Sequence, residues 1–225
     1  MHRKHRRADR HGDPKVQPGD MKRLVAYTSV AHFGFIGLGI FAFTTQGGTG
    51  AVLYMVNHGF STGALFIVVG LLIARGKSRN VDDYGGAAKV TPVLAGLFLL
   101  AGLSALALPG MSTFVSEFLV LVGTFTRYKG FAIIATTGII LAAIYVLYLY
   151  QRTFQGTVSE KVTKFRDVNA REIFAVAPLL ALIVFLGVYP KPVLDVINPA
   201  VKATLHDVQK TDPPPVYKIA NGGQK

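Results

Sequence analysis

Apolar residues gather into five long stretches along the chain, and short polar or glycine-containing stretches separate them. The apolar stretches cover approximately residues 24–43, 51–74, 91–126, 130–150 and 172–189. A helix needs about 20 mostly apolar residues to cross the hydrocarbon core of a bilayer, and each stretch is long enough. The pattern therefore predicts an all-α fold, a polytopic membrane helix bundle of about five spans.

The third stretch does not fit a single continuous span. As one helix it would reach about 54 Å at a rise of about 1.5 Å per residue, well beyond the ~30 Å hydrocarbon core. It contains Pro109 and Gly110 in the sequence LPGMST, which has no charge to hold a hairpin turn at the membrane surface. We therefore predict one discontinuous helix broken at Pro109 and Gly110. Membrane proteins tolerate such breaks where the freed backbone groups are buried in protein or line a wet cavity, and transporters place them at ion sites.

Lysine and arginine residues divide unevenly between the two sides of the predicted bundle. If each stretch crosses once, one side carries Lys22, Arg23 and two basic loops, with Arg75, Lys77, Arg79 and Lys89 in one and Arg152, Lys161, Lys164, Arg166 and Arg171 in the other. The other side carries Arg127, Lys129 and Lys191. By the positive-inside rule, the N-terminus is then cytoplasmic and the C-terminus external. Three tyrosines toward the end of the fourth stretch predict an interfacial belt: Tyr145, Tyr148 and Tyr150.

The two ends of the chain differ in composition from its apolar middle. Residues 1–20 are strongly basic and lack an apolar stretch, which predicts a disordered or foreign head. The first apolar stretch is longer than the core of a cleavable signal peptide, so we interpret it as a retained anchor. Residues 21–190 form the predicted transmembrane domain. Residues 191–225, rich in proline and glycine toward their end, are predicted to be an external, partly disordered tail.

Composition supports membrane insertion and excludes several other functions. Hydrophobic residues make up 51% of the 225 residues, and the mean hydropathy of +0.41 is high for a soluble domain. The net charge of +12 comes without the aromatic-interleaved basic face of a nucleic-acid binder, so we expect a lipid bilayer and no nucleic acid as partner. The chain has no cysteine, which excludes disulfides, thiolate metal sites, iron-sulfur clusters and cysteine nucleophiles within it.

Two histidines and one glutamate fall well inside the predicted spans. Glu117 follows the predicted helix break by two turns, while His32 and His58 lie within the first and second stretches. An ionisable residue in a span costs roughly 3 kcal/mol on insertion scales, and such residues usually face the bundle interior and mark ion or proton paths. Imidazole both donates and accepts a proton. We therefore predict a proton relay of His32, His58 and Glu117, with no catalytic residue and no metal site in this chain.

Each of these residues also has a plainer interpretation. Glu117 can lie near the external end of its helix and extend toward water, although Arg127 and Lys129 mark that boundary better. His32 and His58, taken singly, are as often hydrogen-bonding residues between helices as proton carriers. Their occurrence in consecutive spans, with a glutamate after a broken helix in the third, favours a polar path across the bundle.

Four segments of the chain resemble successive signatures in the C-terminal part of the antiporter-like subunits of respiratory complex I. They are DMKRLVAYTSVAHFGFIGLGI, MVNHGFSTGALFIVVGLL, LALPGMSTFVSEFLVLVGTF and LGVYPKPVLD. Within this family they are most similar to the chain M type of bacterial NADH:quinone oxidoreductase, from about Asp20 to Asp195. Two positions depart from the usual signatures, because Ala31 stands where serine is common before the histidine and Ser116 where glycine is common before the glutamate. Neither departure replaces an ionisable group.

The resemblance implies a multi-pass, proton-translocating protein of the bacterial plasma (inner) membrane. No cofactor is then bound by this chain, because NADH, flavin, iron-sulfur clusters and quinone belong to partner subunits, the other membrane and peripheral subunits of complex I. The family's two mid-membrane histidines correspond to His32 and His58, and its terminal charged residue corresponds to Glu117. Family members have more spans than this chain, so the resemblance also implies that it is truncated relative to them.

Three functions remain open on the sequence alone. The first is a proton-translocating membrane subunit of NADH:quinone oxidoreductase. The second is a subunit of a multi-chain sodium/proton antiporter, whose large chains share these motifs, although VNHGFSTGALF and YPKPVLD are more similar to complex I. The third is a fragment without activity.

Overall fold

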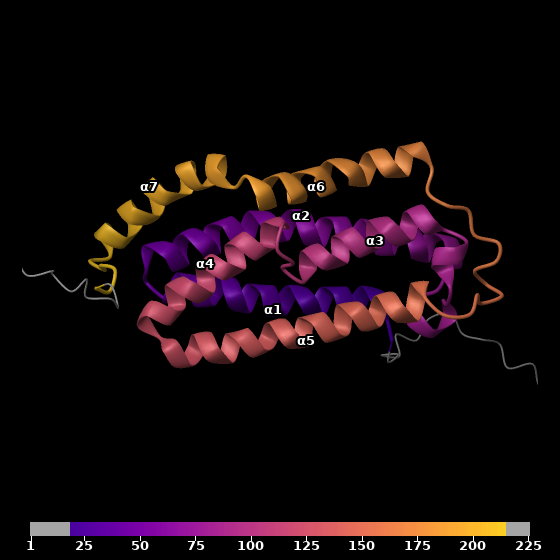
Figure 1. The fold of residues 1–225 in the computed structure, drawn as a ribbon, viewed down its shortest axis with the longest axis horizontal. Helices are drawn as coiled ribbons and strands as arrows, with labels where there is room; N and C mark the ends of the chain where they lie inside the picture. The colour runs from indigo at the N-terminus through magenta and orange to yellow at the C-terminus, as the bar shows by residue number, and fades with distance from the viewer. Residues whose placement is uncertain (1–18, 215–225) are drawn as a thin grey trace, which may run out of the picture.

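The computed structural model describes residues 19–214, and these residues fold into seven α-helices and two short 3-10 helices without a strand. The α-helices are α1 (Met21–Phe41), α2 (Thr45–Gly76), α3 (Pro92–Ala105), α4 (Ser112–Arg127), α5 (Lys129–Phe154), α6 (Ala170–Val188) and α7 (Lys191–Asp207). Most of them run along the long axis of the molecule (Figure 1). The all-α prediction is therefore confirmed, while residues 1–18 of the predicted basic head lie outside the described residues.

Helix α2 is the centre of the bundle. Its 32 residues make it the longest helix, and α1, α3, α4, α6 and α7 all pack against it. Four helices, α1, α2, α5 and α6, are long and apolar enough to cross a membrane. Helices α3 and α4 follow one another along α2, and α3 is a shorter apolar helix (Figure 1). The prediction of a membrane helix bundle of about five spans is confirmed.

The predicted break separates α3 from α4. Helix α3 ends at Ala105, and α4 begins at Ser112. Ala107 adopts the left-handed backbone conformation, with φ of 50°, and Pro109 follows it closely, a combination that commonly ends a helix. Gly110 has φ of 95°, a conformation that glycine adopts without steric cost. The discontinuous helix is confirmed, and its first half ends before Pro109 because the left-handed residue has already ended it.

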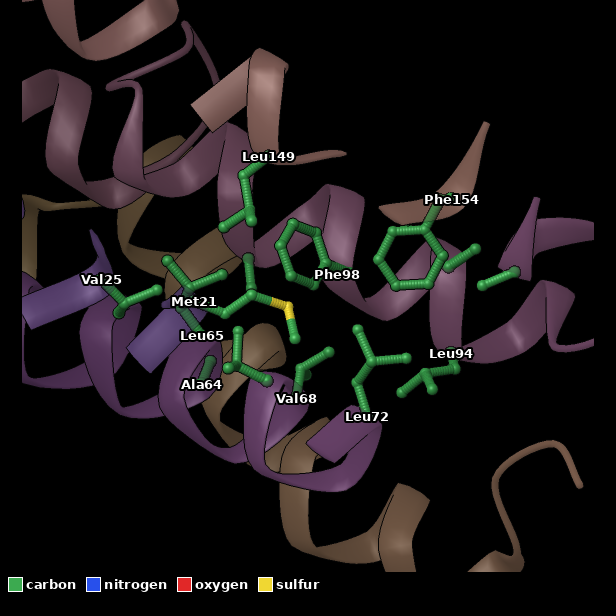
Figure 2. Close-up of a cluster of buried hydrophobic side chains, with 14 of the residues drawn as sticks. Met21, Val25, Ala64, Leu65, Val68, Leu72, Leu94, Phe98, Leu149 and Phe154 are labelled. Carbon is green, nitrogen blue, oxygen red and sulfur yellow. The ribbon is translucent and has the colours of Figure 1, made fainter. Parts of the chain in front are cut away.

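A large apolar core lies toward the end of the bundle where the α2–α3 and α5–α6 loops are found. Figure 2 shows its central side chains, which come from α1, α2, α3 and α5: Met21, Val25, Ala64, Leu65, Val68, Leu72, Leu94, Phe98, Leu149 and Phe154. The rings of Phe98 and Phe154 lie 4.9 Å apart, centroid to centroid. The core holds these four helices together and contains none of the three ionisable residues predicted in the spans.

Ion pairs fix the loops at this end of the bundle. The Lys161 ammonium lies 2.7 Å from the Asp83 carboxylate, and the Ser78 hydroxyl donates a hydrogen bond to the same carboxylate. The hydrogen bond from Lys161, followed by that from Ser78, holds the pKa of Asp83 below its usual value. The stabilisation that this pair contributes is therefore present above a pH of about 4 and is lost as the pH falls through the lowered pKa. Arg75 lies 2.6 Å from Glu172 and ties the end of α2 to the start of α6.

Residues 191–207 of the predicted C-terminal tail form helix α7, which was not predicted from the sequence. These residues form an amphipathic helix, and its buried Ile197 and Val201 pack against Leu53 of α2. Apolar residues recur at helical spacing in this segment, which its prolines obscured in the sequence. Residues 215–225 of the predicted tail lie outside the described part of the chain.

Candidate functional site

The three ionisable residues predicted in the spans come together in one buried cluster. His32 lies on α1, His58 on α2 and Glu117 on α4. Their exposed fractions are 6%, 9% and 6%, respectively. Glu117 therefore faces the interior of the bundle and does not extend to water at the end of its helix.

Tyr54 of α2, which is fully buried, stands between His32 and Glu117. Its hydroxyl oxygen lies 2.6 Å from His32 Nδ1. The same hydroxyl donates to Glu117 Oε2 across 3.4 Å. One phenol thus connects an imidazole of α1 to a carboxylate of α4. Such a connection matters here because a polar group left unpaired in a region of low dielectric constant is costly.

His58 lies beside His32 on the neighbouring helix. The two imidazole rings are 5.3 Å apart, centroid to centroid, and inclined at 42°. Within residues 19–214 no hydrogen bond joins the rings directly, since His58 Nδ1 is paired with Thr62 Oγ1 at 2.7 Å. Its Nε2 is then the atom left to exchange a proton. In the same range, no group of three or more histidine, aspartate or glutamate side chains could hold a metal ion.

The helix break is tied to α2 through Ser112 and Ser116, whereas Pro109 and Gly110 are themselves exposed. The Asn57 amide donates to the carbonyl oxygen of Ser112 at 2.7 Å and to Ser116 Oγ at 3.4 Å. This amide therefore joins the middle of α2 to the first turn of α4. The polar residues that follow the break are therefore held against α2 by a side-chain amide.

Two tyrosines lie at positions that the sequence did not predict. Tyr145 does not belong to the predicted interfacial belt, because its hydroxyl is buried and lacks a hydrogen-bond partner among the described residues, whereas Tyr148 is 47% exposed. Tyr54 was not predicted from the sequence as a residue of the site. Its position four residues before His58 places both side chains on one face of α2, and this spacing is the signal that could have found it.

The region of the chain that forms this cluster matches a known family. Residues 16–144, more than half of the chain, match the family described as "NADH:quinone oxidoreductase/Mrp antiporter, TM". The chain belongs to this family. The matched residues include the whole of α1 to α4, and with them all four side chains of the cluster. The resemblance noted in the sequence signatures is thereby confirmed.

Two curated relatives of this chain carry the same name. The chain is 54% identical over 196 residues to NADH-quinone oxidoreductase subunit M of Mycobacterium tuberculosis (strain ATCC 25618 / H37Rv), and the match covers 87% of this chain and 35% of that protein. It is 44% identical over 183 residues to NADH-quinone oxidoreductase subunit M of Rhodobacter capsulatus, covering 81% and 36%. The chain therefore spans about a third of the length of the curated relatives it matches.

Solved structures of the family share the fold. A chain of respiratory complex I from Thermus thermophilus with bound NADH aligns with a TM-score of 0.76 at 30% identity, over 84% of this chain and 40% of that one. A chain of the Mrp complex from Dietzia sp. DQ12-45-1b aligns with a TM-score of 0.74 at 20% identity, over 82% and 42%. The second likeness shows the fold alone. The chain is thus an antiporter-like membrane protein, and its relatives are subunits of larger complexes.

Proposed function

We propose that the chain is part of a proton-translocating membrane subunit of NADH:quinone oxidoreductase, in which His32, His58 and Glu117 relay protons. The observation that carries the proposal is the buried cluster itself, where hydrogen bonds join groups of α1, α2 and α4 and the ring of His58 lies beside that of His32. Burying ionisable groups in a membrane costs free energy, and the groups that are buried there usually belong to an ion or proton path. The names of the relatives that are 54% and 44% identical support the oxidoreductase over the sodium/proton antiporter.

In this proposal the redox chemistry takes place outside the chain. NADH, flavin, iron-sulfur clusters and quinone bind to partner subunits, and this chain binds none of them. Its own groups only accept, hold and release protons. Its partners are the other membrane and peripheral subunits of the complex, together with the lipid that covers its exposed apolar side chains.

A membrane pull-down tests whether the chain works within such a complex. We expect the tagged 225-residue chain to co-purify with NADH dehydrogenase subunits and with NADH:quinone oxidoreductase activity from the membranes of a host that contains them. An unrelated multi-pass protein with the same tag is the control. Inserted, folded chain that brings down neither subunits nor activity would overturn the proposal and leave an inactive fragment as its alternative.

We also propose that the N-terminus is cytoplasmic and the C-terminus external. The basic α2–α3 and α5–α6 loops lie at one end of the bundle, and α7 lies at the other (Figure 1). Basic loops stay on the cytoplasmic side. Because the chain lacks cysteine, single cysteines report their own location without a background. We expect a membrane-impermeant maleimide to label Asp207→Cys in right-side-out vesicles and Glu160→Cys only in inside-out vesicles. The reverse labelling pattern would contradict this orientation.

A further inference from the structure

The hydroxyl of Tyr54 occupies the only direct hydrogen-bonded route between His32 and Glu117 among the described residues. It contacts His32 Nδ1 at 2.6 Å and Glu117 Oε2 at 3.4 Å. The ring that carries it is fully buried and packs in a small apolar cluster with Ile36, Ala51 and Val120. The phenol is therefore held in place from three helices, and its hydroxyl is the part left free to turn.

We propose that Tyr54 carries the proton between His32 and Glu117, so that this step of the relay passes through a protein hydroxyl in place of a file of water molecules. The proposal rests on the proposed function and adds a residue to it. It assigns to Tyr54 a proton-carrying role and not merely the positioning of its two neighbours.

The single proton of the Tyr54 hydroxyl sets the direction of the hydrogen bonds between His32 and Glu117. A hydroxyl has one proton, so Tyr54 can donate to only one of its two neighbours and must accept from the other. When His32 Nδ1 is protonated, it donates to the Tyr54 oxygen, and Tyr54 donates to the ionised Glu117. When Glu117 is protonated, it donates to Tyr54, and Tyr54 donates to the bare Nδ1 of His32. The two arrangements differ by the net transfer of one proton from His32 to Glu117, in which two protons each move across one hydrogen bond.

The step between these arrangements balances without any oxidant or reductant. The Nδ1–H bond of the His32 imidazolium breaks as a new bond forms from that proton to the Tyr54 oxygen. At the same time the original O–H bond of Tyr54 breaks, and its proton binds Glu117 Oε2. The products are neutral His32 with its proton on Nε2, an intact phenol and a neutral carboxylic acid. Neither a tyrosinate nor a hydronium ion has to persist in the membrane.

This geometry also divides the roles of the two nitrogens of His32. Nδ1 is committed to Tyr54, so an incoming proton must arrive at Nε2. The neighbouring ring of His58, whose centroid lies 5.3 Å from that of His32, can supply it through one intervening water. A proton then enters the imidazole at one nitrogen and leaves at the other. After Glu117 has released its proton, the proton left on Nε2 of His32 must return to Nδ1, by tautomer exchange or rotation of the ring, and the Tyr54 hydroxyl must turn back toward Glu117. Nε2 is then bare and can accept the next proton.

The first test replaces Tyr54 with phenylalanine in the complex that contains the chain. This substitution removes the hydroxyl and keeps the ring, so we expect assembly to remain and proton pumping per NADH oxidised to fall by about a hundredfold, the lower range for a positioned proton-transfer group. Tyr27→Phe is the matched control, because Tyr27 is 59% exposed and, among residues 19–214, its hydroxyl accepts only from Arg23. If Tyr54→Phe pumps normally while Glu117→Gln does not, the Tyr54 proposal is overturned and the proposed function stands.

A second test separates proton transfer from positioning. Incorporation of 3,5-difluorotyrosine at position 54 lowers the basicity of the hydroxyl with almost no change in shape, so a transfer role predicts an altered pumping rate and a purely structural role predicts none. In parallel, infrared difference spectra of the 225-residue chain in lipid nanodiscs report the C=O stretch of protonated Glu117, assigned by its loss in Glu117→Gln. We expect Tyr54→Phe to shift this band to higher frequency and Tyr27→Phe to leave it unchanged. An unshifted band in Tyr54→Phe would show that the hydroxyl does not bond to Glu117, whatever the pumping result.

Discussion

Glu117→Gln is expected to abolish NADH-driven proton pumping in an assembled complex that contains this chain. Glutamine has nearly the volume of glutamate and keeps a carbonyl oxygen that can accept from Tyr54, so the packing of α4 against α2 should persist. It cannot bind and release a proton, so the relay through His32 stops at this position. We expect pumping below about 1% of the unmodified level, in line with the loss of a positioned proton-transfer group. Acidification of sealed vesicles on addition of NADH measures it.

The matched control for this substitution is Glu160→Gln. Glu160 is exposed in the loop between α5 and α6, away from the cluster, and its replacement should leave pumping unchanged. Subunit composition after purification shows whether both variants assemble. Normal pumping by an assembled Glu117→Gln complex would contradict the relay role of Glu117 and, with it, the proposed function. Loss of assembly in Glu117→Gln alone would instead assign the carboxylate a structural role.

The spans and the helix break could be predicted because the bilayer restricts the choices. A hydrocarbon core of about 30 Å sets the length of a crossing, so the long third stretch had to contain an interruption. The pair Pro109 and Gly110 located it to within a few residues. Helix α7 escaped prediction because it lies outside the spans, where no length rule applies, and because Pro192 and Pro199 obscured its pattern of apolar residues.

The cluster was only partly predictable. His32, His58 and Glu117 stand out in the sequence because an ionisable group in an apolar stretch is rare. Tyr54 and Tyr145 do not stand out, because tyrosine is common in membrane helices, both in packing and at the interface. Only the contacts among α1, α2, α4 and α5 show that one hydroxyl bridges two predicted residues and that the other is turned inward. The function of a tyrosine in this bundle therefore depends on tertiary position, which residue type alone does not reveal.

Close packing of α2 against α4 sets the distance between Tyr54 and Glu117, and Gly50 makes that packing possible. A β-carbon at Gly50 would lie 2.7 Å from Val120 N, 2.8 Å from Leu119 Cβ and 2.9 Å from the carbonyl oxygen of Ser116. Two of these atoms belong to the backbone of α4, so they cannot move aside as the end of a flexible side chain could. Small residues at such crossings allow helices in membranes to approach closely.

Gly50→Ala is therefore expected to destabilise the folded chain by about 2 kcal/mol, the usual cost of overpacking a close contact. Gly59→Ala is the control, because Gly59 lies on the same helix with no atom within 4 Å of an added β-carbon. Alanine at that position should be neutral or should stabilise α2 by up to about 1 kcal/mol. Unfolding in a detergent titration, followed by circular dichroism, measures both variants. Equal stability of the two would contradict the close packing of α2 and α4.

The same substitution connects helix packing to the proposed relay. Gly50 precedes Tyr54 by one helical turn, and the carbonyl group it contacts belongs to Ser116, the residue before Glu117. Moving α4 away from α2 lengthens a hydrogen bond between Tyr54 and Glu117 that is already 3.4 Å, and hydrogen bonds weaken quickly beyond that distance. Gly50→Ala should consequently reduce pumping even in the fraction of chains that stay folded. Gly59→Ala, which leaves α4 in place, should not reduce pumping. The pair of variants therefore tests whether the spacing of α2 and α4 determines the rate of proton transfer.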